Sequence, residues 1–249
     1  MNPTYAIVGA TGGIGSELCR RLAAGGARLF LGARTEETLE TLVTELRVHH
    51  SRIHAFPLDA TNSAEVDLFF EQAQSQFGTL SGAVCLTGSI LLKPIHLTND
   101  YEFAETLAIN ATAAFYTLRA AVKALMASGG SVVLASTVAT KIGLMNHEAI
   151  AAAKGAINGM VLAAAATYAA KNIRVNAVAP GLVRTPLTQK LTANEASLKA
   201  STAMHPLGRI GEPADVASLI AWLLDPANTW ITGEIISIDG GLGHLRGRS

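Results

Sequence analysis

Gly9-Ala10-Thr11-Gly12-Gly13-Ile14-Gly15 is the stretch that decides how this chain folds. It directly follows a short apolar run at residues 5–8 and opens a segment of helical periodicity at about residues 14–24. Glycines between a strand and a helix allow a tight turn and a close backbone approach to a pyrophosphate, which the helix N-terminus stabilises. A glycine-rich turn alone is a weak signal, but its place between strand and helix near the N-terminus makes it specific. The stretch therefore predicts a dinucleotide-binding turn.

Strands and helices continue to alternate to the end of the chain. The predicted strands cover residues 5–8, 28–31, 53–58, 82–86, 131–135, 173–179 and 234–238. The predicted helices cover residues 14–24, 36–48, 64–77, 99–126, 149–170 and 213–224, and residues 185–203 form a looser region that resembles a mobile lid. Such alternation predicts a parallel sheet covered on both faces, and right-handed crossovers make it doubly wound. We therefore expect a single Rossmann-type α/β domain over residues 1–249.

The composition argues against several classes of protein. Of 249 residues, 49% are hydrophobic and 15% are charged, which suits a domain with a sizeable core. Nineteen basic and nineteen acidic residues cancel, so nothing favours binding to nucleic acid or to an anionic membrane. The apolar stretch 155–170 is short, alanine-rich and bounded by lysines, and we do not expect it to span a membrane. The basic tail at residues 244–248 is interpreted as a solvated terminus.

The cysteines and the N-terminal residues bear on the compartment. Cys19 and Cys85 lie far apart, in segments with apolar character, and are expected to be free thiols. No signal peptide is expected, because the glycine-rich turn begins within nine residues of Met1. These features predict a cytoplasmic protein. We expect no metal site.

Several further stretches give the chain a family resemblance. They are Leu58-Asp59-Ala60-Thr61, Ile109-Asn110, the helix that carries Lys154, Asn176-Ala177-Val178-Ala179-Pro180-Gly181-Leu182-Val183-Arg184-Thr185-Pro186, Thr232-Gly233 and Asp239-Gly240-Gly241. Together with the Gly-x-x-x-Gly-x-Gly spacing, they resemble the short-chain dehydrogenase/reductase family over nearly the whole chain. The resemblance implies oxidoreductase activity with a nicotinamide dinucleotide.

The resemblance also implies which residues hold this cofactor. The residues matching the pyrophosphate cradle are Gly9, Thr11, Gly13, Ile14 and Gly15. The residues matching the nicotinamide carboxamide site are Pro180, Gly181, Val183 and Thr185. Asp59 would meet the adenine.

The end of the second strand bears on the choice of cofactor. NAD-specific relatives usually place an acidic residue there to hold the ribose hydroxyls, whereas this chain has Gly32-Ala33-Arg34. No carboxylate is present to repel a phosphate, and Arg34 can pair with a phosphate or stack on adenine. We therefore expect NADP, with NAD as the alternative. The alternative interpretation of Arg34 is a solvated loop charge that does not select the cofactor.

The reactive residues depart from the family pattern. Typical members use an asparagine, a serine, a tyrosine and a lysine, and Asn110 and Lys154 match the first and the last by position. The tyrosine position, four residues before Lys154, is Ile150. The serine position, thirteen residues before Ile150, is Thr137, although a local shift would present Ser136 instead. Isoleucine has no proton to give, so the usual general acid, worth roughly 10²–10⁴-fold in rate, is missing.

Two residues near Ile150 keep candidate roles. By resemblance, Lys154 hydrogen-bonds the nicotinamide ribose, a role that needs no phenol. His147 precedes Ile150 by three residues and shares its helical face, so it is a candidate acid. With Asn146 as the expected N-cap, His147 would lie in the first turn, where the helix dipole disfavours an imidazolium. The alternative is an ordinary histidine at the edge of a loop.

Three functions are compatible with this sequence. The leading one is an NADP-preferring oxidoreductase, with reduced or altered activity, in which Asn110 and Thr137 (or Ser136) orient the oxygen of an alcohol or carbonyl substrate. The proton would come from water, substrate or His147. The alternatives are a non-catalytic dinucleotide-binding protein, acting as a sensor or partner subunit, and a non-redox enzyme. The alanine- and glycine-rich helix 149–170 and the resemblance both imply a homodimer or homotetramer.

Overall fold

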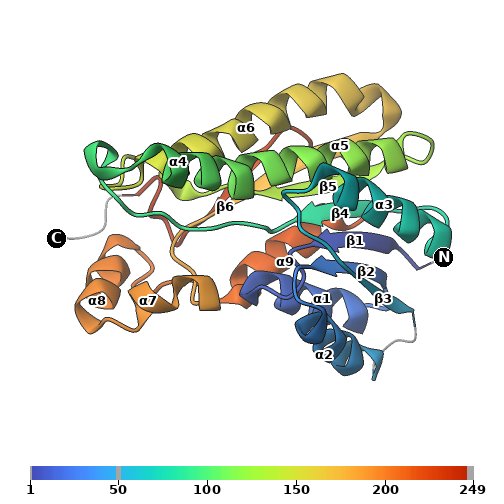
Figure 1. Ribbon diagram of the computed structural model, residues 1–249, viewed down its shortest axis with the longest axis horizontal. Helices are drawn as coiled ribbons and strands as arrows, with labels where there is room; N and C mark the ends of the chain where they lie inside the picture. Colours follow the sequence, from blue (N-terminus) through green and yellow to red (C-terminus); the bar gives the residue numbers. More distant parts are fainter. Residues whose placement is uncertain (1, 49–51, 246–249) are drawn as a thin grey trace.

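Seven parallel strands form one sheet at the centre of the molecule (Figure 1). The computed structural model describes residues 2–48 and 52–245. The strands are β1 (Thr4–Val8), β2 (Arg28–Ala33), β3 (Ile53–Pro57), β4 (Gly82–Cys85), β5 (Gly130–Ala135), β6 (Ile173–Pro180) and β7 (Ile235–Ile238). Their order is β3-β2-β1-β4-β5-β6-β7, so the chain winds outward from β1 in both directions. The predicted doubly wound parallel sheet is confirmed.

Helices cover both faces of this sheet (Figure 1). One face carries α3 (Ser63–Phe77), α4 (Asp100–Leu107), α5 (Ala113–Leu125) and α6 (Glu148–Tyr168), and the other carries α1 (Gly13–Ala24), α2 (Glu36–Arg47) and α9 (Pro213–Leu224). Two hydrophobic cores result, one on each face of the sheet, and β1 contributes side chains to both. Successive side chains of a strand point to opposite faces, so Ala6 and Val8 enter one core while Tyr5 and Ile7 enter the other.

The segment expected to be one helix over residues 99–126 contains a local widening. A π-helical turn, η2 (Ala108–Thr112), joins α4 to α5 without a break. Such turns accommodate an extra residue and occur frequently at functional sites. Asn110 lies within this turn and is fully buried. The helix therefore changes its geometry at a residue that the sequence motifs single out.

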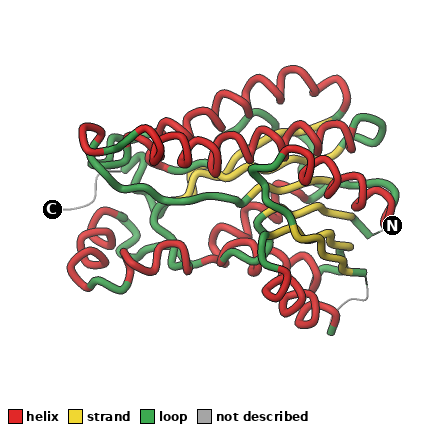
Figure 2. Tube along the Cα trace, viewed as in Figure 1, coloured by secondary structure: helices red, strands yellow, loops and turns green. Residues whose placement is uncertain are grey.

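The expectation of a looser region over residues 185–203 was wrong. This region contains η5 (Pro186–Thr188), α7 (Gln189–Thr192) and α8 (Glu195–Met204). Asn194 caps α8, because its side-chain oxygen accepts a hydrogen bond of 2.9 Å from the Ser197 N–H. Figure 2 shows these short helices at one side of the molecule, away from the sheet. We call residues 186–204 the helical lid.

The start of α6 also differs from expectation. The helix begins at Glu148 with His147 as its N-cap, whereas Asn146 adopts the left-handed conformation at φ 64°. Asparagine tolerates this conformation better than most residues. The Asn146 carbonyl accepts the Lys93 N–H at 2.9 Å, which ties the loop before α6 to the loop after β4. The predicted N-cap was therefore one residue too early.

In the described part of the chain, one helical segment is long and apolar enough to cross a membrane by length and composition. It comprises α6 and the following turn, Glu148–Lys171. In this fold Ile157, Val161 and Ala165 enter the core between α6 and the sheet. A buried core helix meets the same criteria, and we interpret α6 as one.

Candidate functional site

The candidate residues gather where β1, β4, β5 and β6 end. Carboxyl ends of parallel strands meet at one edge of a sheet, and ligands bind where the strand order reverses, here between β1 and β4. The glycine-rich turn follows β1. The loops after β4, β5 and β6 carry Gly88, Thr137 and Gly181, respectively.

The glycine-rich turn is packed too tightly for side chains at two positions. Gly9 has φ +85°, and a Cβ there would lie 2.9 Å from the carbonyl carbon of Leu86. A Cβ on Gly15 would lie 2.2 Å from the Gly9 carbonyl oxygen. A Cβ on Gly12 would have only that same oxygen nearby, at 3.5 Å. The turn is therefore close-packed at Gly9 and Gly15 and open at Gly12, as a phosphate cradle requires.

The N-terminus of α1 is suited to an anion. Gly12 is its N-cap and supplies no capping side chain, and the first turn contains no acidic residue. The first amide groups of a helix have no partner within the helix, and the helix dipole favours negative charge there. Thr11 lines the adjoining cleft, whereas the Ile14 side chain packs against the core, so Ile14 can contribute only its backbone. These residues fit the pyrophosphate of a dinucleotide.

A cleft of about 250 Å³, which we call the cofactor cleft, adjoins this turn. Its walls include Gly9, Thr11, Arg34, Asp59, Gly88 and Ile109. Arg34 is exposed and forms no salt bridge within the described residues. The Thr61 N–H (2.9 Å) and hydroxyl (2.8 Å) donate to the Asp59 carboxylate, and these bonds, more than the nearby charge of Arg34, lower the pKa of Asp59. Asp59 is thus held as an anion beside the cation expected to select the cofactor.

The loop after β6 closes against the glycine-rich turn. A Cβ on Gly13 would lie 2.9 Å from Cγ2 of Thr185, so the two segments touch. Val183 is buried and pairs with Gly211 in an isolated parallel bridge, which anchors the loop. Pro180 ends β6 immediately before it. The residues matching the carboxamide site therefore stand next to those matching the pyrophosphate cradle.

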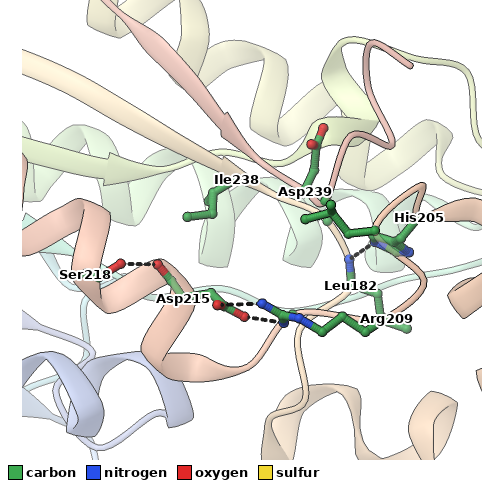
Figure 3. A pocket seen from close by; sticks show the side chains of 11 residues that line it. Leu182, His205, Arg209, Asp215, Ser218, Ile238 and Asp239 are labelled. Atoms are coloured by element: carbon green, nitrogen blue, oxygen red, sulfur yellow. Dashed lines mark hydrogen bonds and ion pairs between the residues drawn. The ribbon is translucent and has the colours of Figure 1, made fainter. Parts of the chain in front are cut away.

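His205 supports this loop from the side of the helical lid (Figure 3). Its Nε2 accepts the Leu182 N–H at 3.3 Å, and its Nδ1 lies 2.6 Å from the Ser201 carbonyl oxygen. A carbonyl oxygen only accepts, so Nδ1 carries the proton and both ring nitrogens are engaged. Nearby, Arg209 is paired with Asp215 at 2.6 Å. His205 is therefore a neutral structural residue of the loop.

Lys154 and Asn110 both lie against Gly88. A Cβ on Gly88 would be 3.4 Å from Nζ of Lys154 and 3.0 Å from Oδ1 of Asn110. Nζ donates to the Ala135 carbonyl at 2.9 Å, and burial lowers the pKa of Lys154 to about 8. The Asn110 amide donates to the Thr106 carbonyl and to Oγ of Ser89, at 2.9 and 3.0 Å. The fold brings together the two reactive residues that match the family pattern.

The two neighbouring hydroxyls after β5 face different ways. Oγ of Ser136 is buried and donates to Oδ1 of Asn158 at 2.6 Å, so it faces α6. Thr137 lines a second cleft, and its Oγ1 accepts the Ala139 N–H at 3.3 Å. Its own proton has no acceptor within the described residues. Of the two predicted candidates, Thr137 reaches the cleft and Ser136 does not.

This second cleft, the substrate cleft, measures about 450 Å³ and lies between the start of α6 and the helical lid. Ile150 forms part of its wall and is 5% exposed, so the position where the family resemblance leads us to expect a tyrosine carries a buried apolar side chain. His147 also lines the cleft, and its Nδ1 lies 2.7 Å from the Met145 carbonyl oxygen. Nδ1 therefore donates to that oxygen. Nε2 has no partner within the described residues.

Sequence reasoning did not single out the polar residues on the opposite wall. Ser201 and His205 line the substrate cleft from α8 and the residue after it, but no motif marks them. The apolar side chains of Leu191 and Met204, from the helical lid, also line the cleft. Among residues 2–48 and 52–245, no three histidine, cysteine, aspartate or glutamate side chains are grouped to hold a metal ion.

Curated proteins and family models match nearly the whole chain. A family model described as enoyl-(acyl carrier protein) reductase matches residues 9–243. A tropinone reductase homologue of Arabidopsis thaliana is 33% identical over 240 residues, which cover 96% of this chain and 91% of that protein. The short-chain dehydrogenase/reductase aba4 of Botryotinia fuckeliana is 35% identical over 250 residues, covering 96% of both chains.

Solved structures agree with this relationship. A short-chain type dehydrogenase/reductase from Mycobacterium ulcerans superposes with a TM-score of 0.94 at 30% identity, covering 99% of this chain and 92% of that chain. A variant of the actinorhodin polyketide ketoreductase with NADPH gives a TM-score of 0.91 at 27% identity, covering 98% of both chains. ElxO with NADP bound also gives 0.91 at 27% identity, covering 97% of this chain and 99% of that chain.

Proposed function

Because the chain belongs to the short-chain dehydrogenase/reductase family, we propose that it is an NADP(H)-dependent oxidoreductase that interconverts an alcohol and a carbonyl compound. The observation that carries this proposal is the position of Lys154 between the two clefts. Its Nζ lies against Gly88 in the wall of the cofactor cleft. One helical turn earlier, Ile150 forms the wall of the substrate cleft.

The cofactor would be held by residues from the loops that follow β1, β2 and β6. The glycine-rich turn and the N-terminus of α1 receive the pyrophosphate, and the loop with Gly181 and Thr185 receives the carboxamide. Arg34 would pair with a phosphate on the adenosine ribose, since β2 ends without the acidic residue that would repel that phosphate, and the nearby Asp59 would meet the adenine. NADPH and NADP in two structural relatives support the same choice. When bound, the nicotinamide supplies or accepts a hydride.

The chain's own residues orient the substrate and handle the proton. The Thr137 hydroxyl donates a hydrogen bond to the substrate oxygen at the Ile150 end of the cleft. In the reducing direction the carbonyl carbon gains a hydride and the oxygen gains a proton. Because Ile150 cannot deliver that proton, it comes from water, from the substrate, or from His147 in the imidazolium form, whose Nε2 also carries a proton. Asn110 and Lys154 hold the cofactor side of the site, and Ser136 acts only through its bond to Asn158.

A dinucleotide-binding protein without catalysis is the competing function. Ile150 favours it, since the cofactor residues are retained while the usual acid is absent. Both functions require NADP(H) binding, and they differ in turnover. A sensor or partner subunit would be stabilised by NADPH yet would leave NADPH unoxidised with every carbonyl compound.

Thermal unfolding with NADPH and with NADH tests both functions. A ligand at ~100-fold excess over its dissociation constant adds roughly 2.7 kcal/mol to the free energy of unfolding, so NADPH should raise Tm clearly. Replacement of Arg34 by alanine should weaken NADPH binding about tenfold or more, because a charge-assisted bond contributes ~1.5–3 kcal/mol. Binding of NADH, which lacks the phosphate, serves as the control and should not change. If neither dinucleotide raises Tm, both functions are excluded.

Turnover then separates the two functions. Oxidation of NADPH is followed spectroscopically with a panel of ketones and aldehydes, and wild type is compared with Lys154→Ala. Slow oxidation that requires Lys154 supports the oxidoreductase. If NADPH stabilises the protein but no ketone or aldehyde of the panel leads to NADPH oxidation, the result supports the binding function.

The proposed function also bears on how the protein assembles and in which compartment it acts. We propose a homodimer or homotetramer formed through α5 and α6, where Phe115 and Leu162 are exposed at 47% and 56%. We also propose a cytoplasmic location and a small-molecule carbonyl or alcohol as the substrate. Both cysteines are buried and free, as a reducing compartment allows.

A further inference from the structure

The composition of the substrate cleft identifies a class of substrate. We propose that this cleft binds an uncharged, predominantly apolar carbonyl compound or the corresponding alcohol. The inference rests on the proposed function for its chemistry, and on the walls of the cleft for the choice of substrate.

Apolar side chains make up most of the cleft wall. They come from the loop after β4, the loop before α6, the helical lid and the C-terminal residues, and include Ile90, Leu92, Leu144, Leu191, Met204 and Leu242. Ile150 extends this surface to the end where the reaction takes place. Among residues 2–48 and 52–245, no aspartate, glutamate, lysine or arginine lines the cleft. A charged ligand would lose its hydration here without gaining a partner of opposite charge, which is strongly unfavourable.

Charged residues close to the cleft are directed elsewhere. Lys190, Glu195 and Lys199 belong to the helical lid but are exposed and absent from the cleft wall. Nζ of Lys154 is bonded to the Ala135 carbonyl and lies on the cofactor side. A ligand in the substrate cleft therefore meets no free cation or anion among the described residues.

Among the described residues around the cleft, the N-terminus of α6 is the feature that would favour an anion. It opens at the cleft, because its N-cap His147 lines the wall. Glu148 occupies the first turn, and a carboxylate there offsets the positive end of the helix dipole. The helix end therefore does not change the preference for an uncharged ligand.

Most polar groups in the wall already have partners. The Thr188 hydroxyl is bonded to the Val183 carbonyl, and both ring nitrogens of His205 are engaged. The hydroxyl proton of Thr137, Nε2 of His147 and the Ser201 hydroxyl have no partner within the described residues. Thr137 and His147 stand at the Ile150 end, and Ser201 is on α8. This distribution suits one carbonyl at the Ile150 end and permits one further uncharged polar group toward α8.

Calorimetric binding to the full chain, with and without saturating NADP⁺, tests this inference. The probes are valerophenone, its para-carboxylate and its para-trimethylammonium derivative, with camphor as a second neutral ketone of different shape. At least one neutral ketone should bind at least tenfold more tightly than both charged derivatives. Met204→Lys places a cation in the cleft wall and should raise affinity for the carboxylate at least tenfold. Lys199→Met, outside the cleft on the same helix, is the matched control and should change nothing.

Each outcome bears on the inference separately from the proposed function. Equal or tighter binding of a charged derivative by wild type overturns it, and so does a lack of binding by both neutral ketones. A Met204→Lys variant that leaves carboxylate affinity unchanged shows that the ligand lies outside this cleft and also overturns it. Failure of the proposed function has a different signature, since Tm would then not respond to NADPH while ketone binding could still be measured.

Discussion

At the scale of the residue, Ile150 changes one property of the site and leaves its neighbours in place. The side chain is buried in the wall of the substrate cleft, one helical turn from Lys154. Thr137 still presents a hydroxyl to the same cleft, and the contacts of Asn110 and Lys154 around Gly88 are intact. Ile150 itself offers no proton donor at this position, whereas Thr137, Asn110 and Lys154 are placed for the roles that we propose for them.

Restoring the phenol should raise turnover. In Ile150→Tyr a hydroxyl returns beside the ammonium of Lys154, and a positioned general acid contributes roughly 10²–10⁴-fold. The measurement is the rate of NADPH oxidation with a ketone that wild type binds. Ile150→Phe has the same ring without the hydroxyl and should stay near wild type. Equal increases in the rate of NADPH oxidation in both variants would mean that packing causes the effect. That result would contradict the proposal that a general acid is missing.

Lys154 should make stability depend on pH. Burial lowers its pKa from 10.5 to about 8 in the folded protein. Between these values the unfolded chain holds more protons, so this group makes the free energy of unfolding rise with pH. Buried Cys19 acts in the opposite sense, because burial raises the pKa of its thiol above the ordinary value of 9.0. The comparison of wild type with Lys154→Met isolates the lysine.

The quantity to measure is the difference in the free energy of unfolding between wild type and Lys154→Met. Urea unfolding at about pH 7 and about pH 9.5 should show wild type gaining roughly 2 kcal/mol relative to Lys154→Met, at 1.36 kcal/mol per pH unit. Cys19 is present in both proteins, so its contribution cancels. A constant difference would mean that the lysine has an ordinary pKa in the folded protein.

Motifs predicted some site residues and could not predict others, for a physical reason. The family resemblance predicted Asn110, Lys154 and the glycines through their positions in shared motifs, and the fold brings them to the same edge of the sheet. The choice between Ser136 and Thr137 needed the structure, because adjacent residues leaving a strand point to opposite sides. Ser201 and His205 depend on how the helical lid docks, which no local pattern specifies.

At the scale of the element, the turn between β1 and α1 has two glycines with opposite tolerance. Gly15→Ala places a Cβ 2.2 Å from a backbone oxygen that cannot move aside. Overpacking typically costs ~1–3 kcal/mol and occasionally more, and this variant belongs at the upper end. Gly12→Ala, with φ −66° and open space, should cost about 1 kcal/mol at most, from a weaker N-cap. Urea unfolding without cofactor measures the free energy of unfolding of both variants. Equal losses of stability in the two variants would contradict the close packing around Gly15.

The elements predicted correctly are those with an apolar run or stripe bounded by turn residues. All seven strands and the helices that cover the sheet were anticipated, because each pairs an apolar run or stripe with clear turn residues. The helical lid was not, since α8 buries no residue fully and its sequence has no pronounced apolar stripe. The π turn at Asn110 arises within an otherwise regular helical pattern and has no signal of its own.

At the scale of the whole molecule, exposed apolar residues on α5 and α6 predict self-association. Leu162→Glu would place a charge in the proposed interface and should shift the protein toward smaller species. Sedimentation velocity measures this shift. Leu68→Glu is the control, because Leu68 is exposed at 42% on α3, outside the proposed interface. A monomeric wild type, or equal effects of both variants, would contradict an interface through α5 and α6.

The outer edge of the sheet has a further consequence at this scale. Nζ of Lys141 donates to the Ile235 carbonyl at 2.7 Å and to the Ser237 hydroxyl at 2.9 Å. The β7 carbonyls that bond to β6 are those of alternate residues, as at Ile238, so the Ile235 carbonyl faces outward. An edge strand with free carbonyls can recruit a strand from another chain, and lysine is a common means of preventing this. The two bonds of Lys141 therefore cover part of the β7 edge and would hinder its pairing with a strand from another chain.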